Sequence, residues 1–160
     1  MQQVFYFTND SWEEISGFNN GLGWPVMLRG KYADANLYVL VIPDNFNDLY
    51  SLPENVLNRI REVLCSQSGI RIAGPAGVSM FLYDNNTFIV ESFNDKPTDI
   101  QIILTRKSGS LTDLLTNEKL DLTTTPAITF SGKVFAPEMY KAKLTLSPHS
   151  FRGFRIDGSH

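Results

Sequence analysis

Residues 37–64 read LYVLVIPDNFNDLYSLPENVLNRIREVL and join the most apolar strand of the chain to its one predicted long helix. Residues 37–42 are apolar at every position, which is typical of a central strand that is covered on both faces. Pro43 ends this strand, and residues 44–48 are expected to form a loop with at most one irregular helical turn. The strands that follow in the sequence then have a strand and a helix to pack on.

The predicted helix, about residues 52–65, begins with the spacing of a capping box. The Ser51 hydroxyl can accept a hydrogen bond from a free backbone N–H, Glu54 can reach back, and Pro53 stands in the first turn, where its missing N–H costs nothing. Apolar residues then recur on a single stripe, at Val56, Leu57, Ile60, Val63 and Leu64. The polar residues between them are expected to face water: Asn58, Arg59, Arg61 and Glu62.

Short apolar runs bounded by turn residues predict strands on both sides of this stretch. Before it, strands are expected at residues 4–8 and 26–28, with one helical turn near residues 11–15 and a turn at residues 30–35. After it, strands are expected at residues 70–73, 78–83, 87–93, 99–105, 111–116, 119–122, 127–130, 141–146 and 150–156.

The clearest hairpin joins residues 78–83 to residues 87–93 through Asp84, Asn85 and Asn86, which tolerate left-handed backbone and make local side-chain bonds. Strands at a spacing of roughly ten residues, with turn signals between them, are typical of an antiparallel sandwich. The candidates for its C-terminal core are Leu144, Leu146, Phe151, Phe154 and Ile156.

The predicted fold class is therefore α+β and mainly β: an antiparallel β-sandwich with one substantial α-helix at about residues 52–65. A single domain over residues 1–160 is expected. Within it we favour a small α/β lobe, residues 1–73, docked on the sandwich, residues 74–160, over a helix that packs across one face of the sheet. An apolar fraction of 42% and an aromatic fraction of 12% suffice for a proper core.

Charge and hydropathy exclude several classes of partner. The net charge of −3, with mixed signs, gives no support to a nucleic-acid partner. No segment approaches the roughly 18 consecutive apolar residues of a membrane span, so no membrane partner is expected. The N-terminus, MQQVFYFTND, does not resemble a signal peptide and looks like a chain cut into at a strand. The native compartment stays open.

Three carboxylates near the helix start, Asp44, Asp48 and Glu54, are candidates for acid–base chemistry. Glycoside hydrolysis needs two carboxyl groups that face one sugar bond, and nothing in the sequence fixes such a geometry. Capping is the alternative that we favour: Asp44 and Asp48 cap turns, and Glu54 completes the helix cap.

Cysteine and histidine give no stronger signal. Cys65, the one cysteine, cannot form an internal disulfide, and no neighbouring histidine supports its use as a nucleophile. The two histidines, His149 in a predicted turn and His160 at the C-terminus, are too few and too far apart in the sequence for a zinc site. Residues 84–86 lack the glycine and distant glutamate of a calcium loop. We expect no cofactor and no metal.

Aromatic side chains in or beside loops are the remaining candidates for a site. Trp12, Trp24 and Tyr50 could form a platform on which the C–H face of a sugar stacks. The alternative, which we favour, is that they plug the end of the sandwich.

Several phrases together resemble a known class of protein: TNDSWEEISG, the GWP of residues 23–25, LYVLVIPDNFNDLYSLPENVLNRIREVL, FLYDNNTFIVESF, LTDLLTNEKL and KLTLSPHSFRGFRI. They are similar to the C-terminal region of large bacterial proteins of glycoside-hydrolase type. In those proteins a (β/α)-barrel and a Rossmann-like domain come first, and a β-rich accessory domain closes the chain. The resemblance spans most of the sequence, but its motifs are structural, so it transfers no catalytic residue.

The resemblance implies a non-catalytic accessory domain of a carbohydrate-active enzyme, with the acid and nucleophile upstream of Met1 and the other domains of the same polypeptide as partners. Such a domain should carry an apolar patch, expected near the N-terminal strand. The alternatives are a carbohydrate-binding module that uses Trp12, Trp24 and Tyr50 on a glycan, and a small stand-alone hydrolase that uses Asp44, Asp48 or His149.

Overall fold

The computed structural model describes residues 12–19, 22–42 and 44–158, without the side chains of residues 12–14, 16–19, 22–24 and 46. The chain divides into two compact units, Met1–Val56 and Leu57–His160. The fold is mainly β with one α-helix, which confirms the predicted class. The strand predicted at residues 4–8 lies outside the described residues. No helix in the described ranges is long and apolar enough to cross a membrane.

The first unit contains a three-stranded antiparallel sheet in the order β1-β2-β3, formed by β1 (Trp12–Asn19), β2 (Leu22–Tyr32) and β3 (Ala35–Leu40). The helical turn predicted near residues 11–15 is wrong, because residues 12–15 belong to β1, which pairs along its length with β2. Only Asn20 and Gly21 separate the two strands in the sequence, and Asn-Gly is the pair most typical of two-residue hairpins. The turn predicted at residues 30–35 is shorter, since β2 runs to Tyr32 and β3 starts at Ala35.

The strand predicted at the centre of the fold is β3, and that prediction is wrong. β3 is an edge strand of its sheet, paired with β2 on one side. Leu37 and Val39 are exposed, and Ile42, just after the strand, is exposed as well. The sequence of an apolar strand does not show whether other elements pack on its faces, because composition does not identify the neighbours of a strand.

A short 3-10 helix, η1 (Phe46–Ser51), precedes α1 (Glu54–Leu64), in line with the irregular turn and the helix expected there. Ser51 ends η1 and Leu52 has extended backbone, so α1 begins two residues later than predicted. Asn45, rather than Asp44 or Asp48, caps η1, because its side chain accepts a hydrogen bond from the Asn47 N–H at 3.2 Å.

The face of α1 differs from the predicted stripe. Val63 is buried, but Leu64 is 75% exposed. Arg61, which was expected to face water, donates hydrogen bonds to the carbonyl oxygens of Gly74 and Pro75 at 2.5 and 2.8 Å. Asn58 accepts one from the Gly74 N–H at 2.9 Å. Polar residues on the flank of the helix thus satisfy backbone groups that the end of a strand leaves unpaired.

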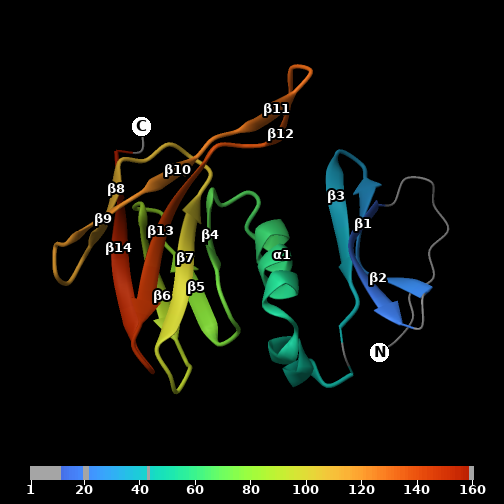
Figure 1. The fold of residues 1–160 in the computed structure, drawn as a ribbon, viewed down its shortest axis with the longest axis horizontal. Coiled ribbons are helices and arrows are strands. Elements are labelled where there is room, and N and C mark those ends of the chain that lie inside the picture. The colour runs from blue at the N-terminus through green and yellow to red at the C-terminus, as the bar shows by residue number, and fades with distance from the viewer. Residues whose placement is uncertain (1–11, 20–21, 43, 159–160) are drawn as a thin grey trace. The chain divides into compact units, whose positions relative to one another are not determined.

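The second unit is an antiparallel sandwich of a four-stranded sheet, in the order β10-β13-β7-β4, and a five-stranded sheet, in the order β5-β6-β14-β8-β9 (Figure 1). The strands are β4 (Ile70–Ala73), β5 (Val78–Leu82), β6 (Thr87–Ser92), β7 (Thr98–Leu104), β8 (Ser110–Asp113), β9 (Lys119–Asp121), β10 (Thr123–Thr125), β13 (Met139–Leu146) and β14 (Phe151–Asp157). The predicted sandwich is confirmed; β10 was missed, since its three threonines carry no apolar signal. The sheet that contains β4 belongs to this unit. The expected sub-lobes, residues 1–73 and 74–160, stay a prediction.

One buried cluster fills the space between the two sheets. Phe88 of β6 and Phe154 of β14 are fully buried, and their rings stack with centroids 5.4 Å apart. Four of the five predicted C-terminal core residues are buried, two on β13 and two on β14: Leu144, Leu146, Phe154 and Ile156. The prediction for the fifth, Phe151, is wrong. Its side chain is 57% exposed, because Phe151 is the first residue of β14 and lies on the face opposite to Phe154.

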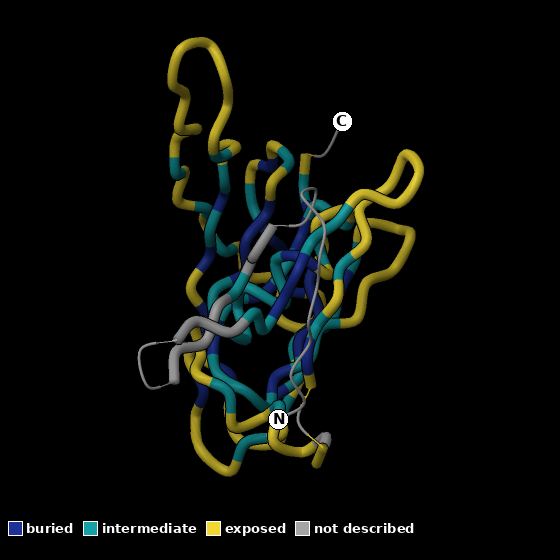
Figure 2. Tube along the Cα trace, turned by 90° about the vertical axis from the view of Figure 1, so that its right-hand side faces the viewer, coloured by how far each residue is buried: buried dark blue, intermediate teal, exposed yellow. Residues whose placement is uncertain are grey.

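The predicted hairpin between β5 and β6 is confirmed, with Asn86 in the left-handed region at φ 61°. A second hairpin, β11 (Ile128–Phe130) and β12 (Lys133–Ala136), was half missed, since only the first of its strands was expected. It forms a two-stranded sheet of its own and projects beyond the sandwich (Figure 1). Residues 126–135 are exposed throughout, as the extended yellow loop of Figure 2 shows. We call this hairpin the arm.

Candidate functional site

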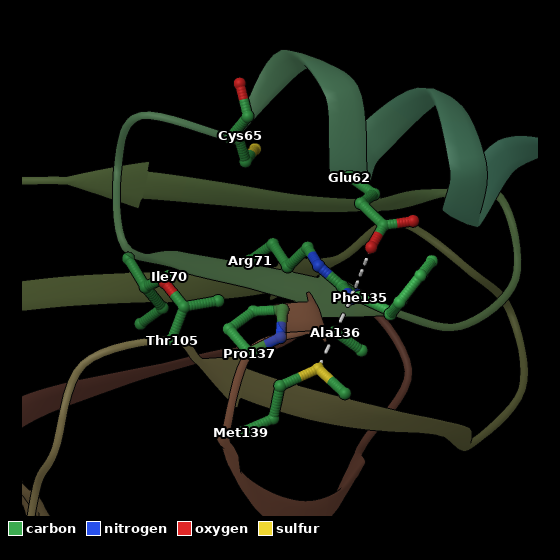
Figure 3. Close-up of a pocket in the computed structure, with 10 residues that line it drawn as sticks. Glu62, Cys65, Ile70, Arg71, Thr105, Phe135, Ala136, Pro137 and Met139 are labelled. Atoms are coloured by element: carbon green, nitrogen blue, oxygen red, sulfur yellow. Dashed lines mark hydrogen bonds and ion pairs between the residues drawn. The ribbon is translucent and has the colours of Figure 1, made fainter. Parts of the chain in front are cut away.

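A cavity of about 250 Å³ lies between the end of α1, strand β4 and the base of the arm (Figure 3). Glu62 of α1 and Arg71 of β4 supply its charges. The remaining lining comes from the turn after α1, the end of β7 and the link from the arm to β13: Cys65, Ser66, Ile70, Thr105, Phe135, Ala136, Pro137 and Met139. Side chains alternate between the two faces of β4, so Ile70 and Ile72 point into the sandwich core, whereas Arg71 points out of it and into the cavity.

An ion pair spans this cavity. One terminal nitrogen of Arg71, Nη2, lies 3.2 Å from Glu62 Oε1 and 4.0 Å from the Met139 sulfur. The Arg71 side chain is 14% exposed and that of Glu62 is 44% exposed, so water screens only one partner well. The pair ties α1 to the outer face of the four-stranded sheet.

Cys65, at the rim of the same cavity, is a free thiol. Burial raises the pKa of this thiol, and the positive charges of Arg71 and Arg61 offset only part of the effect. Because the thiolate is the nucleophile, a raised pKa makes Cys65 less reactive than an ordinary cysteine.

The lining residues can bind a small group but do not form acid–base machinery. Glycoside hydrolysis uses two carboxyl groups, roughly 5 to 9.5 Å apart, on either side of a sugar bond. Glu62 is the one carboxylate among the residues that line this cavity, and it is paired with Arg71. The cavity is therefore a gap in the packing of α1, the four-stranded sheet and the arm, and its lining residues do not form an acid–base pair.

Two carboxylates of the sandwich have depressed pKa values, and both are fixed in structural networks. Asp113, at the end of β8, is 1% exposed; its Oδ1 accepts from the backbone N–H groups of Leu115 and Thr116, and its Oδ2 contacts two nitrogens of Arg152 at 2.7 Å. Burial raises the pKa of Asp113, but the two backbone donors and Arg152 outweigh it and the net pKa is lowered. Asp113 stays ionised and cannot donate a proton near neutral pH.

Asp157, at the end of β14, is held in a similar way. Its Oδ2 accepts from the hydroxyl groups of Thr112 and Ser110 at 2.5 and 3.0 Å, and Arg155 lies 3.1 Å from Oδ1. The bond from Thr112, followed by those from Arg155 and Ser110, lowers the pKa of Asp157 against the effect of burial. Its role is to join β14 to β8.

None of the carboxylates singled out in the sequence lines this cavity. Asp44 precedes η1 and is exposed. Asp48 lies within η1, where its Oδ1 accepts from the Asn45 side-chain amide at 3.2 Å. Glu54 is the exposed first residue of α1.

His149 lies in the turn before β14, as predicted, with φ 47°. Its Nε2 is 2.8 Å from Asp95 Oδ1, and both side chains are largely exposed. His160 lies outside the described residues. Among the residues that the structure describes, no group of three or more histidine, cysteine, aspartate or glutamate side chains could hold a metal ion. Asn85, in the loop compared with a calcium site, instead accepts from the N–H and hydroxyl of Thr87, a local turn bond.

Of the three aromatic candidates, Tyr50 in η1 is 61% exposed. Trp12 opens β1 and Trp24 lies in β2, where it pairs with Gly17; the structure describes only the backbone of both tryptophans. The predicted sugar platform therefore stays a prediction, as does the alternative that these rings plug the sandwich.

Sequence reasoning missed an apolar row on the outer face of the five-stranded sheet. Phe81 of β5 pairs with Ile89 of β6, and Ile89 pairs with Gly153 of β14. Leu114 lies over Gly153: its Cδ1 is 3.5 Å from the point that a Cβ on Gly153 would occupy. With Phe151, two residues before Gly153, these side chains form what we call the outer row: Phe81, Ile89, Leu114 and Phe151.

The outer row is accessible to a partner. Phe81, Leu114 and Phe151 are 46%, 45% and 57% exposed, and Ile89 is half-buried. A signal for it was present in the sequence, because residues 78–83, VSMFLY, do not alternate cleanly between apolar and polar. A sheet face that is only solvated would show that alternation.

Comparison with known families finds a match to the sandwich. The sequence profile of the family described as "Probable glycosyl hydrolase, C-terminal domain" matches residues 69–156. The match covers the sandwich from the start of β4 almost to the end of β14, and it includes the arm. No curated protein and no solved structure matches the chain.

The match confirms the family that the sequence resembles. It spans more than half of the chain and nearly all of the sandwich. The chain therefore belongs to the family of probable glycosyl hydrolase C-terminal domains, and its function is that of a non-catalytic accessory domain.

Proposed function

We propose that this domain belongs to a longer polypeptide whose preceding domains hold the glycosidase active site, and that it stabilises them by packing its outer row against them. The outer row is the observation that carries the proposal. Its members cross neighbouring strands of one sheet face, so the apolar surface is contiguous: Phe81, Ile89, Leu114 and Phe151. Contiguous apolar surface of this kind is typical of protein interfaces.

The chemistry of the outer row favours a protein partner over a glycan. Two of its four side chains are aliphatic and none carries a hydrogen-bonding group. Sugar sites add polar groups to a stacking ring, because each buried sugar hydroxyl needs a partner. An apolar patch on a folded neighbour needs none.

The first test is the mass of the native protein in its source cells, by immunoblot with an antibody against this chain. We expect a band several times heavier than 18.0 kDa, the mass of the chain itself. A band at 18.0 kDa would show that the protein stands alone and would remove the accessory role.

The second test introduces Phe81→Ser together with Phe151→Ser. Both side chains are half exposed, so the isolated chain should keep its stability and gain solubility. In the longer polypeptide the same pair should lower the melting temperature of the glycosidase part. Tyr32→Ser is the matched control, an exposed aromatic of the other unit that should change neither. Equal melting of the double variant and the wild type would contradict the proposal.

A second candidate is carbohydrate binding, which the exposed ring of Tyr50 favours. A tyrosine that is 61% exposed can stack against a pyranose ring, and Asn47 and Asp48 beside it are exposed polar groups. Affinity electrophoresis with soluble polysaccharides should then lose its retardation in Trp12→Ala, Trp24→Ala and Tyr50→Ala. Retardation that persists in all three variants would exclude this platform.

A further inference from the structure

The arm has four large apolar side chains that are exposed to solvent. Ile128 is 62% exposed, Phe130 71%, Val134 64% and Phe135 68%. The arm is nevertheless well built: Ser131 and Gly132 both have positive φ, 48° and 76°, which is the geometry of a tight two-residue hairpin turn. A regular hairpin that displays four large apolar side chains differs from a loose surface loop.

Both faces of the arm carry exposed apolar side chains. Phe130 pairs with Lys133, so their side chains share a face, and the ring of Phe135 meets that of Phe130 edge-on at 6.3 Å. Thr129 and Val134 pair on the other face. A flat partner could cover only one of these faces, whereas a groove covers both.

The root of the arm is fixed to the sandwich. Phe135, Ala136 and Pro137 line the cavity that holds the Arg71–Glu62 pair (Figure 3). The remainder of the hairpin has no partner strand besides its own, since β11 and β12 form a separate two-stranded sheet. Hairpins of two strands are marginal in water without further packing. The arm is thus attached to the sandwich at its root, and its tip is exposed to solvent.

We propose that the arm inserts into an apolar groove of the domain that precedes this one in the same polypeptide. The inference rests on the proposed function, and it names a second contact, distinct from the outer row. The family places this sandwich at the C-terminal end of a longer hydrolase, which supplies a neighbouring folded surface. Because that surface is covalently attached, the arm needs little intrinsic affinity to stay bound.

The side chains of the arm select the class of partner. Lys133 is its one charged residue, and its large side chains are hydrocarbon. A groove lined by apolar residues, with a carboxylate where Lys133 emerges, matches this composition. A glycan would leave its hydroxyl groups without partners against Ile128, Val134 and Phe135.

The experiment measures how fast a cysteine at the tip of the arm reacts with a maleimide. Ser131→Cys is introduced with Cys65→Ser, both in the isolated chain and in the longer polypeptide, and the labelled peptide is quantified by mass spectrometry. Lys107→Cys, in an exposed turn between β7 and β8, is the matched control. We expect labelling at position 131 to be at least about tenfold slower in the longer polypeptide, with position 107 unchanged.

Adding Ile128→Ser and Phe130→Ser should restore fast labelling at position 131 in the longer polypeptide. The same double change should leave the circular dichroism of the isolated chain unaltered, since both side chains are exposed and neither lines the cavity at the root of the arm. That comparison separates loss of docking from loss of folding.

Equal labelling of position 131 in both forms would overturn the proposal and leave the accessory role intact. Protection of the isolated chain that grows with its concentration would assign the arm to a second copy instead. Protection of the isolated chain by added polysaccharide would assign it to a glycan. An immunoblot with only an 18.0 kDa band would remove the preceding domain, and with it both the accessory role and this use of the arm.

Discussion

Asp113 is the one charged residue among the buried residues of the described ranges, and its surroundings explain how the sandwich tolerates it. Backbone N–H groups of Leu115 and Thr116 bind one carboxylate oxygen, and Arg152 binds the other. The Arg152 guanidinium also lies over the buried ring of Phe154, 5.2 Å from its centroid. The carboxylate thus anchors the turn after β8 and positions an arginine above the core.

Asp113→Asn should destabilise the chain by about 2–4 kcal/mol, because the partly buried Arg152 keeps only the exposed carboxylate of Glu118, 3.8 Å away, as a counter-charge. Urea unfolding followed by circular dichroism measures the change. Asp95→Asn is the control: Asp95 is 93% exposed and pairs with an exposed His149, so its loss should cost less than about 1 kcal/mol. Equal losses in the two variants would contradict the assigned role.

The same pair predicts a dependence on pH. The pKa of Asp113 is lower in the folded chain than its unfolded value of about 3.9, so the stability that it contributes is present above that value. This contribution is lost as the pH falls through the folded pKa. The difference in unfolding free energy between wild type and Asp113→Asn should therefore be full at pH 7 and shrink below about pH 4. A difference that grows on acidification would show the opposite sign of shift.

At the scale of elements, α1 shows what an apolar stripe does and does not predict. Its existence and approximate length follow from the sequence, since the 3.6-residue period is strong over residues 56–63. Its flanks do not, because the bonds of Asn58 and Arg61 reach a chain segment that begins 13 residues later. Gly74 accepts and donates there with φ +154°, and a Cβ would lie 2.9 Å from the Ile100 side chain.

Arg61→Met should cost about 1–3 kcal/mol, since methionine keeps the apolar stem but leaves the carbonyl groups of Gly74 and Pro75 without their donor. Thermal unfolding of the isolated chain measures the loss. Arg155→Met is the control, because that arginine is 55% exposed and its ion pair with Asp157 should contribute less than about 1 kcal/mol. If the two variants melted together, Arg61 would be a solvated residue, as its sequence position suggested.

Strands were predicted best where their partners lie close in the sequence. The hairpin of β5 and β6 follows from its Asp-Asn-Asn turn. The arm carries an equally local signal, Ser131-Gly132 between the short runs ITF and KVF, but its exposure could not be inferred from composition. β3 shows the same limit, because its apolar pattern predicts two covered faces, whereas it lies at a sheet edge.

At the scale of the whole molecule, the sandwich was predictable and the order of strands within each of its sheets was not. Turn spacing predicts many short antiparallel strands, and the structure has them in two packed sheets. Which strand joins which sheet depends on pairs far apart in sequence, such as β4 with β7. No local pattern encodes that pairing, so β4 was grouped with the strands that precede it. The outer row was missed for the same reason, since its members lie on three strands and a turn.

The distribution of the core predicts that residues 54–160 fold without the first unit. Every member of the buried cluster lies between Ile70 and Ile156, and the hydrogen bonds that Arg61 donates to Gly74 and Pro75 stay within this fragment. The fragment should unfold in one cooperative urea transition, as a single-core domain does. A shorter fragment, residues 69–160, lacks α1, so it should unfold at lower urea, because Gly74 and Pro75 lose their donor.

The two tryptophans allow a check in the intact chain, because Trp12 and Trp24 both lie in the first unit. Tryptophan fluorescence therefore reports that unit alone, while circular dichroism is dominated by the larger sandwich. If the sandwich folds on its own, the urea midpoint by circular dichroism in the intact chain should match that of residues 54–160, whatever the fluorescence midpoint is. A fragment without a cooperative transition would mean that the sandwich depends on residues 1–53, and the matched residues 69–156 would then be only part of the folding unit.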